Sequence, residues 1–148
     1  MAKNIDGLEL SAKVFRLLRK LVPSFLNECP SLRIVFFYAD DFFIEFPCDD
    51  SATASDGQAV AKWLFTPRPD NVPKVLKYWL DDDDENFAPK IEAFKAAFAL
   101  ASSPANFIVI IRFHSCYFAD SVMPFGLTNE LTGEQLALRA GPFYSLNI

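Results

Sequence analysis

Two runs of β-branched and aromatic residues constrain the fold of this chain most strongly. Residues 32–38 read LRIVFFY and residues 106–113 read NFIVIIRF. Successive side chains of a strand point to opposite faces, and in both runs the two faces are largely apolar. Strands of this kind are buried at the centre of a sheet. We therefore expect two central strands, the first of them covered at least in part on each side.

Further strands are expected close to these runs in the sequence. Residues 42–46 (FFIEF) follow the first run after a short break, and this spacing predicts a β-hairpin. Residues 58–65 (QAVAKWLF) fit either a helix or a strand, and the alternation within them favours a third strand. A short strand is expected within residues 117–125. Thr132-Gly133 predicts the turn of a second hairpin.

Three helices are expected from apolar spacing and capping residues. Asp6 suits the N-cap of the first, which ends before Pro23. Its apolar side is Leu10, Val14, Leu17, Leu18 and Leu21, and its other side is basic, with Lys13, Arg16, Arg19 and Lys20. Such a basic stripe is most often a solvated face. The second helix is capped by Asp70 and runs to about Leu80, and the third spans residues 87–101.

The order of these elements predicts a fold class. The expected strands come in clusters and do not alternate singly with helices, which favours antiparallel pairing. The chain has 148 residues, a length typical of one domain. We therefore expect one α+β domain over residues 1–148, with a mainly antiparallel sheet packed by about three helices.

Composition excludes several classes of function. The net charge is −5, which disfavours nucleic acid as a partner. The longest fully apolar runs have six residues, far below the roughly 20 that a membrane helix needs. Three cysteines without a CxxC pair indicate a reducing compartment, and the start of the chain lacks the apolar run of a signal peptide. We expect a cytoplasmic protein that binds neither nucleic acid nor membrane and carries no cofactor.

One constellation offers a catalytic alternative. On an extended segment His114 and Cys116 point the same way, as a thiol nucleophile and its base require, and Asp120 is placed to orient the imidazole. The alternative without a catalytic role is that His114 and Cys116 are a partly buried pair at the end of a strand. A zinc site from these two residues with Cys29 and Cys48 has suitable ligand types, but it lacks the paired spacing of known zinc motifs. A hydrolytic pair of carboxylates also remains open.

Clustered carboxylates favour a binding role instead. Candidate partner-binding residues are Asp40, Asp41, Asp49, Asp50, Asp81, Asp82, Asp83, Asp84 and Glu85. Asp81 and Asp82 follow the end of an expected helix, where negative charge is unfavourable, so a partner is one explanation for them. No P-loop, GxGxxG, GxSxG or HExxH motif is present.

These observations favour a non-catalytic protein-binding module, such as an acidic inhibitor or immunity-type protein with a more basic partner. Two alternatives stay open. The first is a small enzyme using the Cys/His pair or paired carboxylates. The second is a self-associating structural subunit, because sixteen Phe exceed what a core of this size needs and some of them would suit a symmetric dimer.

Overall fold

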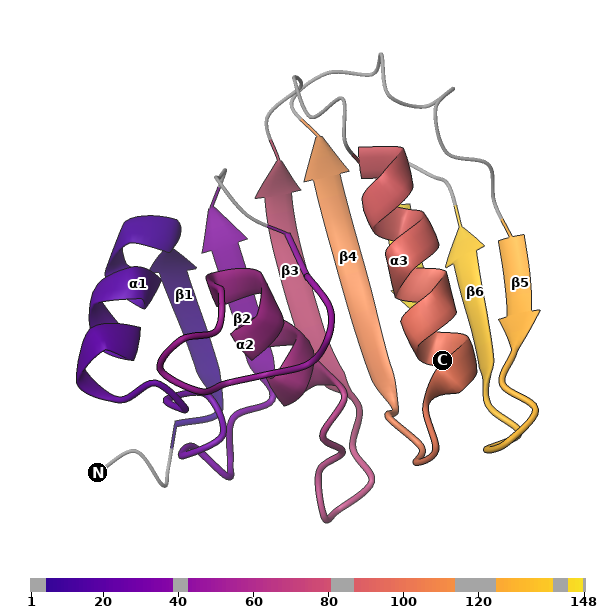
Figure 1. Cartoon of the computed structure of the whole chain (residues 1–148), viewed down its shortest axis with the longest axis horizontal. Coiled ribbons are helices and arrows are strands. Elements are labelled where there is room, and N and C mark those ends of the chain that lie inside the picture. Colours follow the sequence, from indigo (N-terminus) through magenta and orange to yellow (C-terminus); the bar gives the residue numbers. More distant parts are fainter. Residues whose placement is uncertain (1–4, 39–42, 81–86, 114–124, 140–143, 148) are drawn as a thin grey trace.

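The computed structural model describes residues 5–38, 43–80, 87–113, 125–139 and 144–147. Strands alternate singly with helices over the first three quarters of the chain, and three further strands follow (Figure 1). The elements are β1 (Gly7–Ser11), α1 (Ala12–Leu21), β2 (Ile34–Tyr38), α2 (Asp56–Leu64), β3 (Lys74–Leu80), α3 (Phe87–Leu100), β4 (Phe107–Phe113), β5 (Phe125–Thr128), β6 (Gln135–Arg139) and β7 (Tyr144–Asn147).

The strands form one sheet in the order β1-β2-β3-β4-β7-β6-β5. The first four are parallel to one another, and β7, β6 and β5 add antiparallel strands beside β4. The chain combines helices and strands as expected, but the prediction of a mainly antiparallel sheet is wrong. A helix separates each of the first four strands from the next, and such crossovers join parallel strands.

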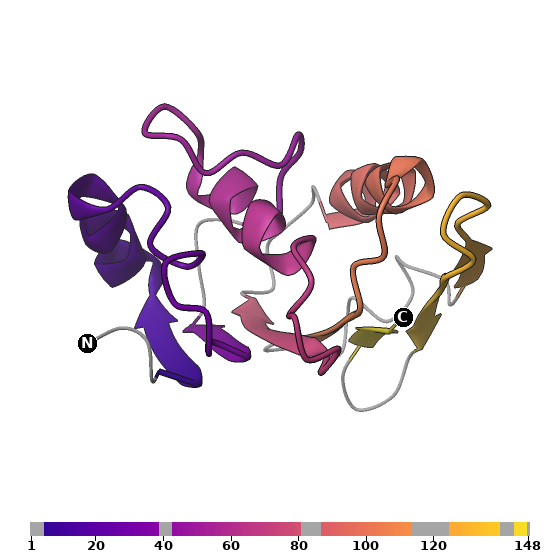
Figure 2. The same cartoon turned by 90° about the horizontal axis from the view of Figure 1, so that it is seen from below.

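All three described helices lie on the same face of the sheet (Figure 2). Crossovers between parallel strands are almost always right-handed. Because β1, β2, β3 and β4 follow one another in a single direction across the sheet, each crossover turns over the same side. The main core therefore lies between this helical layer and the sheet, where Phe15, Val60, Phe94 and Phe107 are fully buried. Among the described residues, no helix lies on the opposite face.

The expected hairpin of residues 32–38 and 42–46 does not form. β2 pairs with β1 on one side and with β3 on the other. Phe43 and Ile44 are buried but are not in a strand, and the Phe43 ring packs against Tyr78 with their centroids 5.0 Å apart. The apolar pattern correctly marked β2 as a strand inside the sheet. Its neighbours, however, come from segments farther away in the chain.

Residues 58–64 form most of helix α2, so the third strand expected at residues 58–65 is wrong. Ser55 caps this helix: its side chain accepts a hydrogen bond from the Gln58 backbone N–H, and the Gln58 side chain accepts one from the Ser55 N–H. Both halves of a capping box are thus present. The Ser-x-x-Gln spacing was the sequence signal that favours the helix over the alternation.

Residues 74–80 form strand β3, where we expected a helix. Asp70 does not cap a helix but closes a turn, in which its carboxylate accepts hydrogen bonds from the Arg68 side chain and from the Val72 N–H. Lys74, Leu76 and Tyr78 then alternate inward, and all three are buried. The apolar residues of this segment suit two faces of a buried strand as well as one helical stripe, and the tertiary position of the segment decides between these structures.

The first helix begins later than expected. Its N-cap is Ser11, whose side chain accepts a hydrogen bond from the Val14 N–H, and residues 7–11 form β1. The buried side of α1 carries Phe15 and Arg19. The predicted apolar side is therefore wrong: Leu17 is 52% exposed and Leu21 is 81% exposed.

Three predictions in the second half are confirmed. The helix expected at 87–101 is α3, the strand expected at 106–113 is β4, and Thr132-Gly133 lies in the turn between β5 and β6. Gly133 has a φ of 77°, which a residue without a side chain adopts most easily. The strand expected within residues 117–125 lies outside the described residues except at Phe125, where β5 begins.

Lys74 is a buried cation that caps the carboxyl end of α2. Its Nζ donates hydrogen bonds to the carbonyl oxygens of Trp63, at 2.6 Å, and Thr66. The same atom lies 4.9 Å from the centroid of the Trp63 ring. A positive charge is favourable at this end of a helix. Burial, helped by the nearby charge of Arg68, lowers the pKa of Lys74 from 10.5 to about 8.

We expect this lowered pKa to appear in the pH dependence of stability. Between about pH 8 and 10.5 the unfolded chain retains a proton that folded Lys74 has released. The contribution of Lys74 to the free energy of unfolding therefore rises with pH in this window. Denaturant titrations of wild type and Lys74→Met should show the wild type gaining stability relative to the variant from pH 8 to 10. Parallel pH profiles would contradict the assignment.

A second prediction concerns Gly57 in the first turn of α2. A Cβ atom there would lie 2.2 Å from the Phe43 carbonyl oxygen. Alanine normally stabilises a helix relative to glycine, but here the clash reverses the sign, and we expect Gly57→Ala to lower the free energy of unfolding by about 1–3 kcal/mol. Gly126→Ala is the control, because nothing lies within 4 Å of its added Cβ. Chemical denaturation of both variants measures the difference, and equal stabilities would refute the close packing.

Candidate functional site

The face of the sheet opposite the helices is not covered by any described helix (Figure 2). It is built by the side chains that alternate with the buried ones on four neighbouring strands. We call it the open face. Its described residues are Glu9 on β1, Ile34, Phe36 and Tyr38 on β2, Val75, Lys77 and Trp79 on β3, and Ile108, Ile110 and Arg112 on β4.

Exposure differs sharply between the two faces. On the helical side Val35, Leu76 and Val109 are fully buried. On the open face Ile34, Phe36, Val75, Trp79, Ile108 and Ile110 are only half-buried, and Tyr38 is 41% exposed. Parallel sheets are found almost only with both faces covered. Contiguous apolar surface of this kind marks an interaction site more often than a solvated surface.

Contacts between side chains order the open face. The Phe36 and Tyr38 rings pack with their centroids 4.6 Å apart. The Tyr38 hydroxyl donates a hydrogen bond of 2.8 Å to Glu9 Oε2, and this bond is the main cause of a raised Tyr38 pKa. The Arg112 guanidinium lies 5.4 Å from the centroid of the Trp79 ring. The face therefore presents aromatic and aliphatic groups with a few charges among them.

We expected the first run to be covered at least in part on each side. The helical layer provides this cover on one side only, as far as the described residues extend. The sequence did contain the signal for the open face, namely apolar residues at both phases of β2, β3 and β4. What it did not contain is the direction of the crossovers, which leaves one of the two faces without helices.

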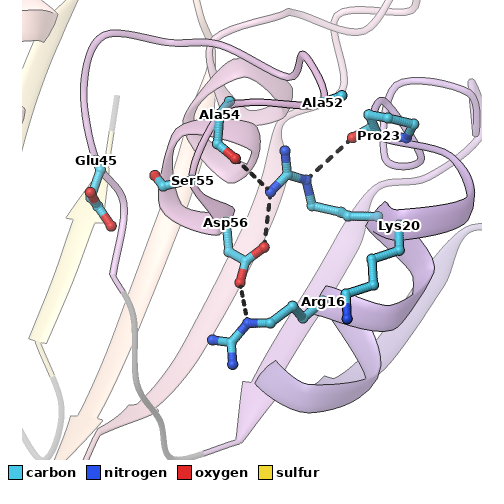
Figure 3. A pocket seen from close by; sticks show the side chains of 9 residues that line it. Arg16, Lys20, Pro23, Glu45, Ala52, Ala54, Ser55 and Asp56 are labelled. Carbon is cyan, nitrogen blue, oxygen red and sulfur yellow. Dashed lines mark hydrogen bonds and ion pairs between the residues drawn. The ribbon is translucent and has the colours of Figure 1, made fainter.

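A second feature is a groove between α1 and the loop that precedes α2, with a volume of about 620 Å³ (Figure 3). Asp56 lines it, and its carboxylate forms ion pairs with Arg16 and Arg19. Arg16 Nε is 3.0 Å from one carboxylate oxygen, and Arg19 Nη1 is 2.9 Å from the other. The Lys20 side chain and Glu45 also line the groove.

Arg19 holds this region together. Besides its ion pair with Asp56, its guanidinium donates hydrogen bonds to the carbonyl oxygens of Pro23, Ala54 and Ser51. Its side chain is only 8% exposed. The expectation of a solvated basic stripe is therefore wrong at this position, because the helix rotates Arg19 toward the loop. We interpret the ion pairs and hydrogen bonds in this groove as a structural link between α1 and α2, since the Asp56 carboxylate already has two cationic partners.

The predicted partner-binding acids divide into two groups. Asp49 and Asp50 are described, and both accept hydrogen bonds nearby: Asp49 Oδ1 from the Ser51 N–H at 2.9 Å, and Asp50 Oδ2 from Asn27 Nδ2 at 3.0 Å. The bond from Ser51 lowers the Asp49 pKa. The second group, Asp40, Asp41, Asp81, Asp82, Asp83, Asp84 and Glu85, lies outside the described residues. The strands that precede this group in the sequence, β2 and β3, end at the same edge of the sheet (Figure 1).

The catalytic and zinc alternatives depend largely on residues that the structure does not describe. His114, Cys116 and Asp120 all lie there. Cys29 and Cys48 are free thiols, and burial is the main cause of a raised pKa in each, which makes them poorer nucleophiles. Within the described ranges, no three side chains of the metal-binding types gather in one place.

Comparisons with known proteins add no relative: no family model, curated protein or solved structure matches the chain. In the part of the chain that the structure describes, no helix has the length and apolar character needed to cross a membrane. The functional argument therefore depends on the residues themselves.

The structural interpretation of Arg19 predicts a large difference between two neighbouring arginines. Arg19→Met leaves the Asp56 carboxylate with one partner and removes the donor from three backbone carbonyls, and should lower the free energy of unfolding by about 3 kcal/mol or more. Arg16, whose side chain is 51% exposed, forms one ion pair, and Arg16→Met should cost less than about 1 kcal/mol. Urea denaturation compares them, and equal losses would contradict the proposed structural link.

Proposed function

We propose that the chain is a non-catalytic protein-binding module and that a protein surface covers the open face of its sheet. The observation that carries this proposal is the contrast between the two faces: the parallel strands β2, β3 and β4 place half-buried apolar side chains on a side that no described helix covers. Burial of apolar area is the main favourable term in protein association. A partner on this face would supply the cover that such sheets have in other proteins.

The composition of the open face supports a protein partner. Aromatic residues and arginine are enriched in protein interfaces, and Phe36, Tyr38, Trp79 and Arg112 are all of these types. The apolar groups lie on the inner strands β2, β3 and β4 together with Lys77 and Arg112, whereas Glu9 lies on the edge strand β1. Apolar and aromatic groups with a few charges among them are typical of protein interfaces.

The acidic inhibitor or immunity-type role stays part of this proposal. The net charge of −5 would attract a basic partner and speed its approach. Asp49 and Asp50 are engaged by their own surroundings, so we propose that the overall negative charge, and not these two carboxylates, attracts the basic partner, while a protein surface covers the open face. The sparse cysteines continue to favour a cytoplasmic location for such a complex.

Photo-cross-linking tests the proposed function directly. A benzophenone-bearing phenylalanine analogue is placed at position 36 and the chain is irradiated in its source cells. We expect adducts in which position 36 is joined to a second protein chain. The same analogue at position 62, an exposed site on the helical side, is the control and should give far fewer adducts.

Mass spectrometry of the cross-linked peptides identifies the chain that contacts position 36. A mixture of unlabelled and ¹⁵N-labelled protein separates adducts within one chain from adducts between two copies. Adducts confined to the same chain would mean that the chain covers its own open face, and the proposed function would be wrong. Equal yields at positions 36 and 62 would also contradict it.

A further inference from the structure

We propose that the protein surface that covers β1, β2 and β3 on the open face is that of a second copy of this chain, related to the first by a two-fold axis that runs parallel to β2. The inference rests on the proposed function, because it names the partner of the same face. It is carried by the positions of the charged and small residues on the three strands β1, β2 and β3.

Charge is self-complementary about β2. In the register of the sheet, Phe36 lies between Glu9 on β1 and Lys77 on β3. Neighbouring strands are about 4.8 Å apart, so the backbone positions of Glu9 and Lys77 are about equally far from Phe36 on opposite sides. A two-fold axis along β2 exchanges these sides. It therefore places Glu9 of each copy opposite Lys77 of the other, and the contact contains two equivalent ion pairs.

The size of the side chains follows the same rule. Two residues before Phe36 on the same strand, Ile34 lies between Gly7 on β1 and Val75 on β3. The axis places Gly7 of one copy opposite Val75 of the other, so a residue without a side chain faces a branched one. The described surroundings of Gly7 are open there, since an added Cβ would meet only the Ile34 carbonyl oxygen, at 3.8 Å.

The resulting contact has the anatomy of a stable interface. Ile34, Phe36 and Tyr38 of the two copies meet along the axis, with the sheets about 10 Å apart as in packed β-sheets. Glu9 lies on the edge strand of its sheet, so both ion pairs lie at the rim, where water reaches them. Apolar groups at the centre and solvated charges at the rim are typical of protein interfaces.

The alternative two-fold axis, perpendicular to the strands, is disfavoured by the same charges. Where it crosses the strands at Phe36, it would place β1 opposite β1 and so bring the two Glu9 carboxylates together, with the two Lys77 ammonium groups likewise opposed. Like charges at close range cost free energy. The axis along β2 avoids both clashes, which is why we assign that arrangement.

Charge reversal tests the arrangement. The self-association constant of the purified chain is measured by sedimentation equilibrium for wild type, Glu9→Lys, Lys77→Glu and the double variant. Each single reversal places like charges opposite each other in both ion pairs across the axis, and it should weaken self-association about tenfold or more. The double reversal restores opposite pairs and the wild-type net charge, and should recover the affinity to within about threefold. Lys62→Glu, on the helical side, is the control for a change in net charge and should leave the affinity unaltered.

The possible outcomes separate this inference from the proposed function. A wild-type chain that stays monomeric at all concentrations overturns the proposed dimer. If position 36 of that monomer cross-links to a different protein, the proposed binding function stands. If position 36 cross-links only within its own chain, both the dimer and the binding function are wrong. A dimer that tolerates the single reversals, or that the double reversal does not recover, overturns the two-fold arrangement along β2. Loss in both single variants with recovery in the double variant supports it.

Discussion

The structure depends on one geometric constraint: the handedness of the connections between parallel strands. Right-handed crossovers that proceed in one direction across a sheet return over the same side each time. α1, α2 and α3 therefore share one face (Figure 2), and the main core is the layer between them and the sheet. The opposite face has the same kind of strand residues without a described helix over it. The candidate surface is thus a consequence of chain topology and not of any local motif.

Two cationic side chains position the middle helix within this layer. Arg19 joins α1 to Asp56 of α2 and to the carbonyl oxygens of Ser51 and Ala54 in the loop before it. At the other end of α2, Lys74 donates to the carbonyl oxygens of Trp63 in the last turn and of Thr66 just beyond it. Both cations are buried and both satisfy polar backbone groups that would otherwise lose their hydrogen bonds on folding. Arg19, one member of the basic stripe predicted from the sequence, is therefore part of the interior architecture. On the open face Glu9 and Lys77 are exposed, and the Glu9 carboxylate accepts a hydrogen bond from the Tyr38 side chain and not from buried backbone.

Local patterns predicted some elements and misled at others for identifiable reasons. The third helix, the strand at β4 and the turn at Gly133 follow from spacing and turn chemistry within one segment, and they are confirmed. β3 was mistaken for a helix because its apolar residues suit both periods, and α2 was mistaken for a strand although its capping box favours the helix. The candidate site was visible only in part: β2 was recognised as apolar on both faces, but the sequence showed neither which strands flank it nor that one side lacks a helical layer.

By itself, the sequence determined the strands β2 and β4, the helix α3 and the turn at Gly133. It also showed which residues are apolar enough to be buried and which familiar catalytic motifs are absent. These properties depend on side chains close together in the chain. Only the tertiary structure decided that β2 lies between β1 and β3, that the first four strands are parallel, and that Phe36 lies between Glu9 and Lys77. Strand pairing joins residues that are 27 to 41 positions apart in that row of the sheet. The free energy of such contacts depends on crossover direction and packing of the whole layer, and neither quantity has a local signature in the sequence.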